Sequence, residues 1–151
     1  MKTLADPRCT VELLERLKAV RPDSVRRWGR MSPHQMICHV SDAYRMATGE
    51  RLASDATGTL QRTVIKWVAL YTPMRWPTGI QTRPEADQHR GGTSPVDFAA
   101  DVAMLATLLE SIVARRSQLW PTHPIFGPMT EKEWLRWGYL HMDHHLRQFG
   151  A

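Results

Sequence analysis

The chain has 151 residues, of which 42% are hydrophobic and 23% charged, and its formal net charge is +5. This length predicts a single domain over residues 1–151 with a core of its own, and the composition excludes a disordered, collagen-like or coiled-coil protein. A basic chain is compatible with nucleic acid, a membrane surface or small anions as partners.

The basic residues do not form long clusters. Arg26, Arg27 and Arg30 make one small group and Arg115–Arg116 another, and neither is a run of five or six like charges. No predicted helix interleaves basic residues with exposed aromatic ones, which argues against nucleic acid as a partner. We therefore interpret the charge as a solvated basic surface.

The chain shows no sign of export or membrane insertion. No apolar stretch reaches the roughly 18 residues that a membrane-spanning helix needs, and the N-terminus lacks the apolar core of a signal peptide. The two cysteines, Cys9 and Cys38, are too few for a disulfide scaffold. These features predict a cytoplasmic protein with no membrane partner.

The first two predicted helices have amphipathic patterns and clear ends. The first covers residues 10–20 and stops before Pro22. Its apolar face consists of Leu13, Leu14, Leu17 and Val20. The second begins at Ser32, an N-cap followed by a proline and by the capping-box residue Gln35, and it stops at Gly49. Its apolar face includes Met36, Val40, Ala43 and Ala47.

A shorter third helix is predicted over residues 60–71, and a long loop rich in proline and glycine follows it. The helix places Val64, Trp67, Val68 and Tyr71 on one side. Residues 73–92 exceed the usual length of a connection without secondary structure in a compact domain. Two interpretations of this loop stay open, an ordered wrap along the surface and a functional lid.

Two further helices complete the predicted fold. The fourth starts at the cap Ser94 and runs to about Ser117, and the last runs from the capping box at Thr130 nearly to Phe149. No segment alternates with the period of a strand. The sequence thus predicts an all-α protein, an antiparallel four-helix bundle with a short extra helix and a long Pro/Gly-rich loop.

Three histidines occupy positions where a core residue is expected. His141 and His145 are one helical turn apart, on the face that also carries two core tryptophans, Trp134 and Trp137. His39 lies in the apolar stripe of the second helix. A buried imidazole without a partner costs about 1–3 kcal/mol, whereas three inward imidazoles satisfy one another through a divalent ion.

Three neutral imidazoles leave one position of a tetrahedral ion open to water or substrate, which is typical of catalytic metal sites. We therefore predict His39, His141 and His145 as metal ligands. Two alternatives stay open at this point: His39 is a satisfied core histidine, or His144, at the margin of the same face, replaces His145 as ligand.

Several residues near the three histidines have less specific predicted roles. Gln148 shares the face of the histidines and is a candidate hydrogen-bond partner of a ligand or of the substrate. Asp42 and Asp143 lie off that face, so we expect solvated acids. Cys38 is rotated by about 100° from its neighbour in the metal face, which favours a packed thiol over a ligand. Residues 75–76 of the long loop, an arginine and a tryptophan, are candidates for the mouth of the site.

The histidine segments also resemble a known family. Residues 28–45 and 138–148 resemble the first and last metal-ligand helices of the DinB-like superfamily. Residues 76–87, 92–98 and 123–130 resemble a compact branch of it that is described as a domain of unknown function. The resemblance covers nearly the whole chain. It implies a four-helix bundle, a zinc or nickel ion on His39, His141 and His145, a low-molecular-weight thiol such as glutathione, bacillithiol or mycothiol, and a homodimer as one assembly.

Two functional hypotheses follow. The leading one is a metal-dependent enzyme of thiol-transferase type that acts on a small-molecule substrate, with the ion stabilising a bound thiolate. The alternative is a non-catalytic, metal-stabilised bundle or a small-molecule-binding protein. No catalytic or cofactor-binding residue follows from the sequence.

Overall fold

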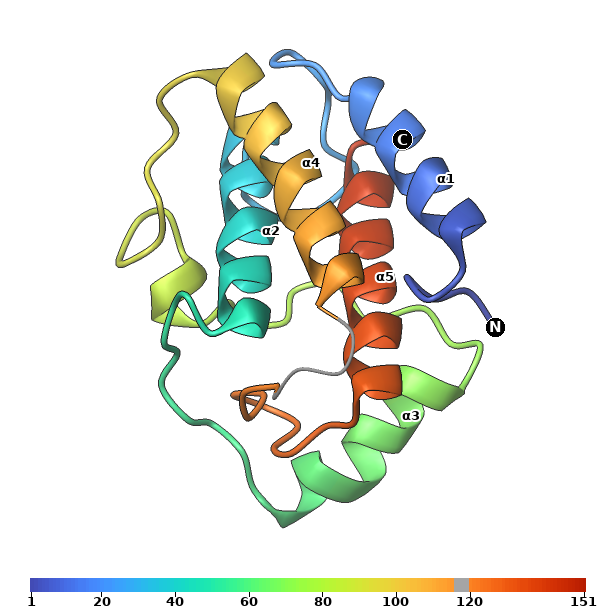
Figure 1. The fold of residues 1–151 in the computed structure, drawn as a ribbon. Helices are drawn as coiled ribbons and strands as arrows, with labels where there is room; N and C mark the ends of the chain where they lie inside the picture. Colours follow the sequence, from blue (N-terminus) through green and yellow to red (C-terminus); the bar gives the residue numbers. More distant parts are fainter. Residues whose placement is uncertain (116–119) are drawn as a thin grey trace.

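The computed structural model describes residues 1–115 and 120–151 (Figure 1). Within these ranges the chain forms five α-helices and no β-strand, so the described part is all-helical, as the sequence predicts. The helices are α1 (Pro7–Lys18), α2 (Pro33–Thr48), α3 (Lys66–Tyr71), α4 (Phe98–Ala114) and α5 (Glu131–Gln148). A π-helical turn, Gln61–Ile65, leads into α3, and a 3₁₀ turn, Pro84–Ala86, lies in the long loop. None of the helices in the described ranges is long and apolar enough to cross a membrane.

The two helices that carry the three histidines begin at capping boxes. The backbone amide of Gln35 donates to Ser32 Oγ at 3.1 Å. In return, the backbone amide of Ser32 donates to the side-chain oxygen of Gln35, Oε1, at 2.9 Å. Thr130 and Glu133 form the same reciprocal pair at the start of α5. Such a cap contributes about 1 kcal/mol and determines the residue at which the helix begins. The angular positions of the histidines on α2 and α5 therefore follow from local sequence.

The first helix begins earlier than predicted. It starts at Pro7 rather than Thr10 because Asp6 is the N-cap, and the Arg8 amide donates to its carboxylate at 3.0 Å. It ends at Lys18, two residues before the predicted end. The predicted apolar face is unaffected, since the helix keeps its phase.

The fourth helix begins later than predicted. It starts at Phe98 rather than directly after Ser94, because the side chain that caps it is Asp97. Its predicted end near Ser117, and Arg116 of the second basic pair, lie outside the described residues.

The long helices α1, α2, α4 and α5 enclose one core (Figure 1). Helix α2 contacts both α4 and α5, and α1 contacts α5. The core includes Leu13 and Leu17 of α1, Met36 and Val40 of α2, Leu105 and Leu109 of α4, and Trp134 and Met142 of α5. Because burying each such side chain contributes roughly 1.5–3 kcal/mol, this contact determines which faces of α2 and α5 point inward.

Helix α3 does not bury the face predicted for it. Val64, Trp67 and Tyr71 are 56%, 60% and 42% exposed, and the buried residue of this helix is Leu70. The π-helical turn before α3 breaks the 3.6-residue repeat on which that prediction rests. The helix lies against α5, where Arg136 Nε donates to the Leu70 carbonyl at 3.1 Å.

The long loop is an ordered segment that packs on α2. Its 3₁₀ turn contacts α2 and buries Ala86. This packing brings the loop next to His39, whose Nδ1 lies 2.9 Å from the Ala86 carbonyl oxygen.

Candidate metal centre

His39 of α2 and His141 and His145 of α5 converge in the interior, and we call them the three-histidine group. Their ring centroids lie 5.2, 4.6 and 4.8 Å apart, for the pairs 39–141, 39–145 and 141–145. One ring nitrogen from each lies within 4.8 Å of the other two. His39 and His145 are buried and His141 is partly exposed. The group is thus able to hold a metal ion, with its open side at His141.

A backbone carbonyl of the long loop determines the tautomer of His39. His39 Nδ1 lies 2.9 Å from the Ala86 carbonyl oxygen, which only accepts, so Nδ1 carries the proton. The lone pair is then on Nε2, which faces His141 Nε2 at 3.3 Å. The hydrogen bond aims the unprotonated nitrogen at the other histidines, as a partner of a metal ligand does.

The side-chain amide of Gln148 determines the tautomer of His145. Gln148 Nε2 donates to the Trp28 carbonyl at 2.9 Å, which sets the orientation of the amide. Its Oε1 therefore faces His145 Nδ1 at 3.0 Å, and Nδ1 donates. The lone pair of His145 is on Nε2. Gln148 thus lies where the sequence places it, in contact with a candidate ligand.

The three rings are neutral at neutral pH. Burial lowers the pKa of each, well below its usual range for His141 and His145, and the neighbouring imidazoles lower the pKa of those two further. Neutral imidazole is the form that binds metal. His141 Nδ1, the nitrogen that does not face His39, is buried and has no hydrogen-bond partner among the described residues. Three converging neutral imidazoles fit a zinc-type ion.

Tryptophans form the walls of the group. Trp137 stacks on His141 with ring centroids 4.9 Å apart and planes 10° apart. The ring centroid of Trp76, in the long loop, lies 6.2 Å from those of both His141 and His144. Trp76 and Arg75 also line a neighbouring cavity of about 330 Å³. The partly exposed edge of His141 is therefore bordered by an aromatic surface.

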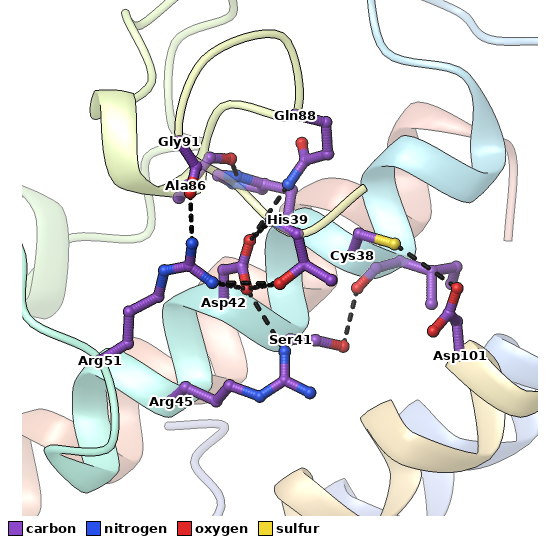
Figure 2. A network of polar contacts seen from close by, with 12 residues as sticks. Cys38, His39, Ser41, Asp42, Arg45, Arg51, Ala86, Gln88, Gly91 and Asp101 are labelled. Carbon is purple, nitrogen blue, oxygen red and sulfur yellow. Dashed lines mark hydrogen bonds and ion pairs between the residues drawn. The ribbon is translucent and has the colours of Figure 1, made fainter. Parts of the chain in front are cut away.

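The prediction that Asp42 is a solvated acid is wrong. Its side chain is fully buried and accepts a hydrogen bond from Arg51 at 2.6 Å (Figure 2). It also accepts hydrogen bonds from the backbone amide and the hydroxyl of Thr93 at 2.7 and 2.6 Å. Arg45 and Gln88 approach it at 3.3 Å. The reason is that the long loop covers this side of α2. The network fastens to α2 the segment that carries the Ala86 carbonyl.

The remaining candidates are not members of the three-histidine group. Asp143 is largely buried in ion pairs with Arg16 at 2.8 Å and Arg147 at 2.9 Å. His144 is partly exposed and is not a member of the group, although its ring is 5.1 Å from that of His145. Cys38 is buried and free, as expected of a packed thiol, and burial raises its pKa to about 12.

Sequence reasoning missed the two carbonyls that orient the ligands, at Trp28 and Ala86. Every residue has a carbonyl, so nothing in the sequence distinguishes these two. The glycine after Trp28 was the one usable signal that another group approaches the backbone here. Gly29 has a φ of 77°, which favours glycine, and a Cβ at this position would lie 2.6 Å from Gln148 Nε2.

The fold and the site together define a protein whose described part is all-helical, with an inward-facing three-histidine group between α2 and α5. The model of the family "protein of unknown function (DUF1569)" matches residues 12–151, so the chain belongs to this family. No curated protein and no solved structure matches the chain.

Proposed function

We propose that the chain binds a divalent ion through His39, His141 and His145 and acts as a metal-dependent enzyme of thiol-transferase type. The observation that carries this proposal is the orientation of the rings: fixed hydrogen bonds direct the unprotonated Nε2 of His39 and of His145 toward a common point. Zinc or nickel suits three imidazoles. The proposal includes the finer fold assignment, a four-helix bundle of DinB-like type, and a cytoplasmic location where thiols stay reduced. The bundle is not antiparallel throughout as the sequence predicts, because the first turns of α2 and α4 are in contact through His34 and Asp101 and these two helices run in the same direction.

A divalent ion bound there would supply Lewis acidity and lower the pKa of a thiol or water in its open position. The chain's own residues would orient the ligand rings and exclude water. The Ala86 carbonyl and Gln148 hold the ligand rings in one orientation, and Trp137 excludes water from one side of His141. The small-molecule substrate would enter along Trp76 at the partly exposed edge of His141.

Metal content after native purification tests the ligand assignment. The His39→Ala, His141→Ala double variant should contain one equivalent of metal less than the parent, while His89→Ala, at an exposed histidine, should match the parent. A double variant with the same metal content as the parent would remove the three-histidine group from consideration.

Thiol chemistry is tested separately. The metal-loaded protein, given glutathione and a chlorinated aromatic electrophile, should form the thioether at a rate that the double variant loses. The deep burial of His39 and His145 also suits a second candidate, a metal-stabilised bundle without catalysis. That candidate predicts the same metal loss, a lower melting temperature without metal, and no effect of glutathione on the spectrum of a bound cobalt ion.

A further inference from the structure

A second set of metal-binding side chains lies between α2 and α4. His34 and Cys38 are one turn apart on α2, and Asp101 is in the first turn of α4. One ligand atom from each lies within 4.8 Å of the other two. Cys38 precedes His39 and so points about 100° away from the three-histidine group, toward α4 (Figure 2).

Contacts within this set, which we call the α2–α4 group, converge on one oxygen atom. His34 Nε2 lies 2.7 Å from Asp101 Oδ2, and Cys38 Sγ donates to the same oxygen at 3.7 Å. In a tetrahedral zinc site, with bonds of about 2.0–2.3 Å, neighbouring ligand atoms lie roughly 3.3–3.8 Å apart. The sulfur–oxygen distance already fits, and the nitrogen–oxygen distance requires only a small opening.

We propose that His34, Cys38 and Asp101 form a second site, for a divalent ion of the zinc class. Imidazole, thiolate and carboxylate are all zinc ligands, and water would complete the coordination. The side chains of His34 and Asp101 are 21% and 26% exposed, so ion and water have access. Binding forms a metal–sulfur bond and releases the Cys38 proton to solvent.

The consequence is a clamp between the starts of two helices. α2 and α4 are in contact, and the ion would join the first two turns of α2 to the first turn of α4. This position is beside His39 in sequence but on another face of α2. Occupancy of the second site is therefore independent of the three-histidine group.

Cobalt spectroscopy distinguishes the two sites because only the α2–α4 group contains sulfur. The metal-free protein titrated with Co²⁺ should take up two equivalents and develop a thiolate-to-cobalt charge-transfer band in the near ultraviolet. Cys38→Ser should lose this band and one equivalent. The His39→Ala, His141→Ala double variant should keep the band and lose the other equivalent.

Cys9→Ser is the matched control, since Cys9 is the other buried free cysteine and lies on α1. It should keep both the band and the second equivalent. A parent that binds cobalt without a charge-transfer band would overturn the second site and leave the three-histidine group standing. This readout needs only the parent, so misfolding of a variant does not obscure it.

Discussion

Gln148 connects the backbone near the start of α2 to the candidate metal centre. Its amide spans from the Trp28 carbonyl to His145 Nδ1, with both hydrogen bonds at about 3 Å. Partners of this kind orient a metal ligand, and their loss typically costs 10–100-fold in metal affinity. The amide has room only because the residue after Trp28 is a glycine.

Gly29→Ala should therefore weaken metal binding. The new Cβ would lie 2.6 Å from Gln148 Nε2 and displace the amide, so we expect zinc affinity, measured by competition with a chelator, to fall by roughly 10–100-fold. Gly79→Ala is the control, because Gly79 has a similar φ of 80° but open space around its Cβ. Equal zinc affinities in the two variants would show that Gln148 does not orient a ligand.

His123 makes the folded state sensitive to acid. Its Nδ1 accepts the amides of Ile125 and Phe126 at 3.1 and 3.0 Å, and burial lowers its pKa to about 3. In the unfolded chain the pKa is about 6.5, so the unfolded state binds more protons between these two values. The contribution of His123 to stability is complete above pH 6.5 and declines as the pH falls toward 3.

His123→Asn keeps an acceptor but removes this titration. Between pH 6.5 and 4, the free energy of unfolding should fall less steeply than in the parent, by up to about 1.4 kcal/mol per pH unit. Denaturant titrations at several pH values measure the difference, with His89→Asn as the exposed control. Parallel curves for parent and His123→Asn would contradict the assignment.

At the scale of elements, the long loop contributes to the candidate metal centre because Asp42 fastens it to α2. The carboxylate is fully buried and binds Arg51 and Thr93, which lie on either side of the turn that contains Ala86. Removing one partner of a buried ion pair is costly, although Arg51 is a quarter exposed, which reduces the cost.

Asp42→Asn should destabilise the chain by about 2–3 kcal/mol and loosen the loop. Hydrogen exchange should rise in residues 84–93, and zinc affinity should fall because the Ala86 carbonyl no longer holds His39. Asp23→Asn is the control, because it makes the same change of charge at an exposed position. The coupling is refuted if exchange in the loop rises while zinc affinity stays at the parental value.

At the scale of the whole molecule, the three-histidine group joins elements far apart in the chain. His39 and His141 are 102 residues apart, so an ion between them would hold α2 and α5 together. A ligand that binds only the folded state stabilises it by mass action, by about 4 kcal/mol when its free concentration is 1,000 times Kd.

Removing metal with a chelator should therefore lower the melting temperature. For a domain of this size 1 kcal/mol corresponds to about 2–4 °C, so we expect a decrease of roughly 8–16 °C by calorimetry. The His39→Ala, His141→Ala double variant should have a lower melting temperature than the parent before chelation, and the chelator should lower it by less. An unchanged melting temperature in the chelated parent would show that no ion couples the helices.

Local chemistry in the sequence determined much of this protein. Capping residues set the starts of α2 and α5, and the 3.6-residue repeat placed their apolar faces inward. Because both signals act within a few residues, the convergence of His39, His141 and His145 was predictable.

The path of residues 73–92 was decided only by tertiary structure. That segment has no repeat to set its direction, so neither the burial of Asp42 nor the contact of the Ala86 carbonyl with His39 followed from the residues themselves. The exposed face of α3 has a similar origin, since a π-helical turn shifts the phase that the pattern assumes. The inward faces follow from interactions along one helix, whereas the environment of the histidines depends on how distant segments pack together.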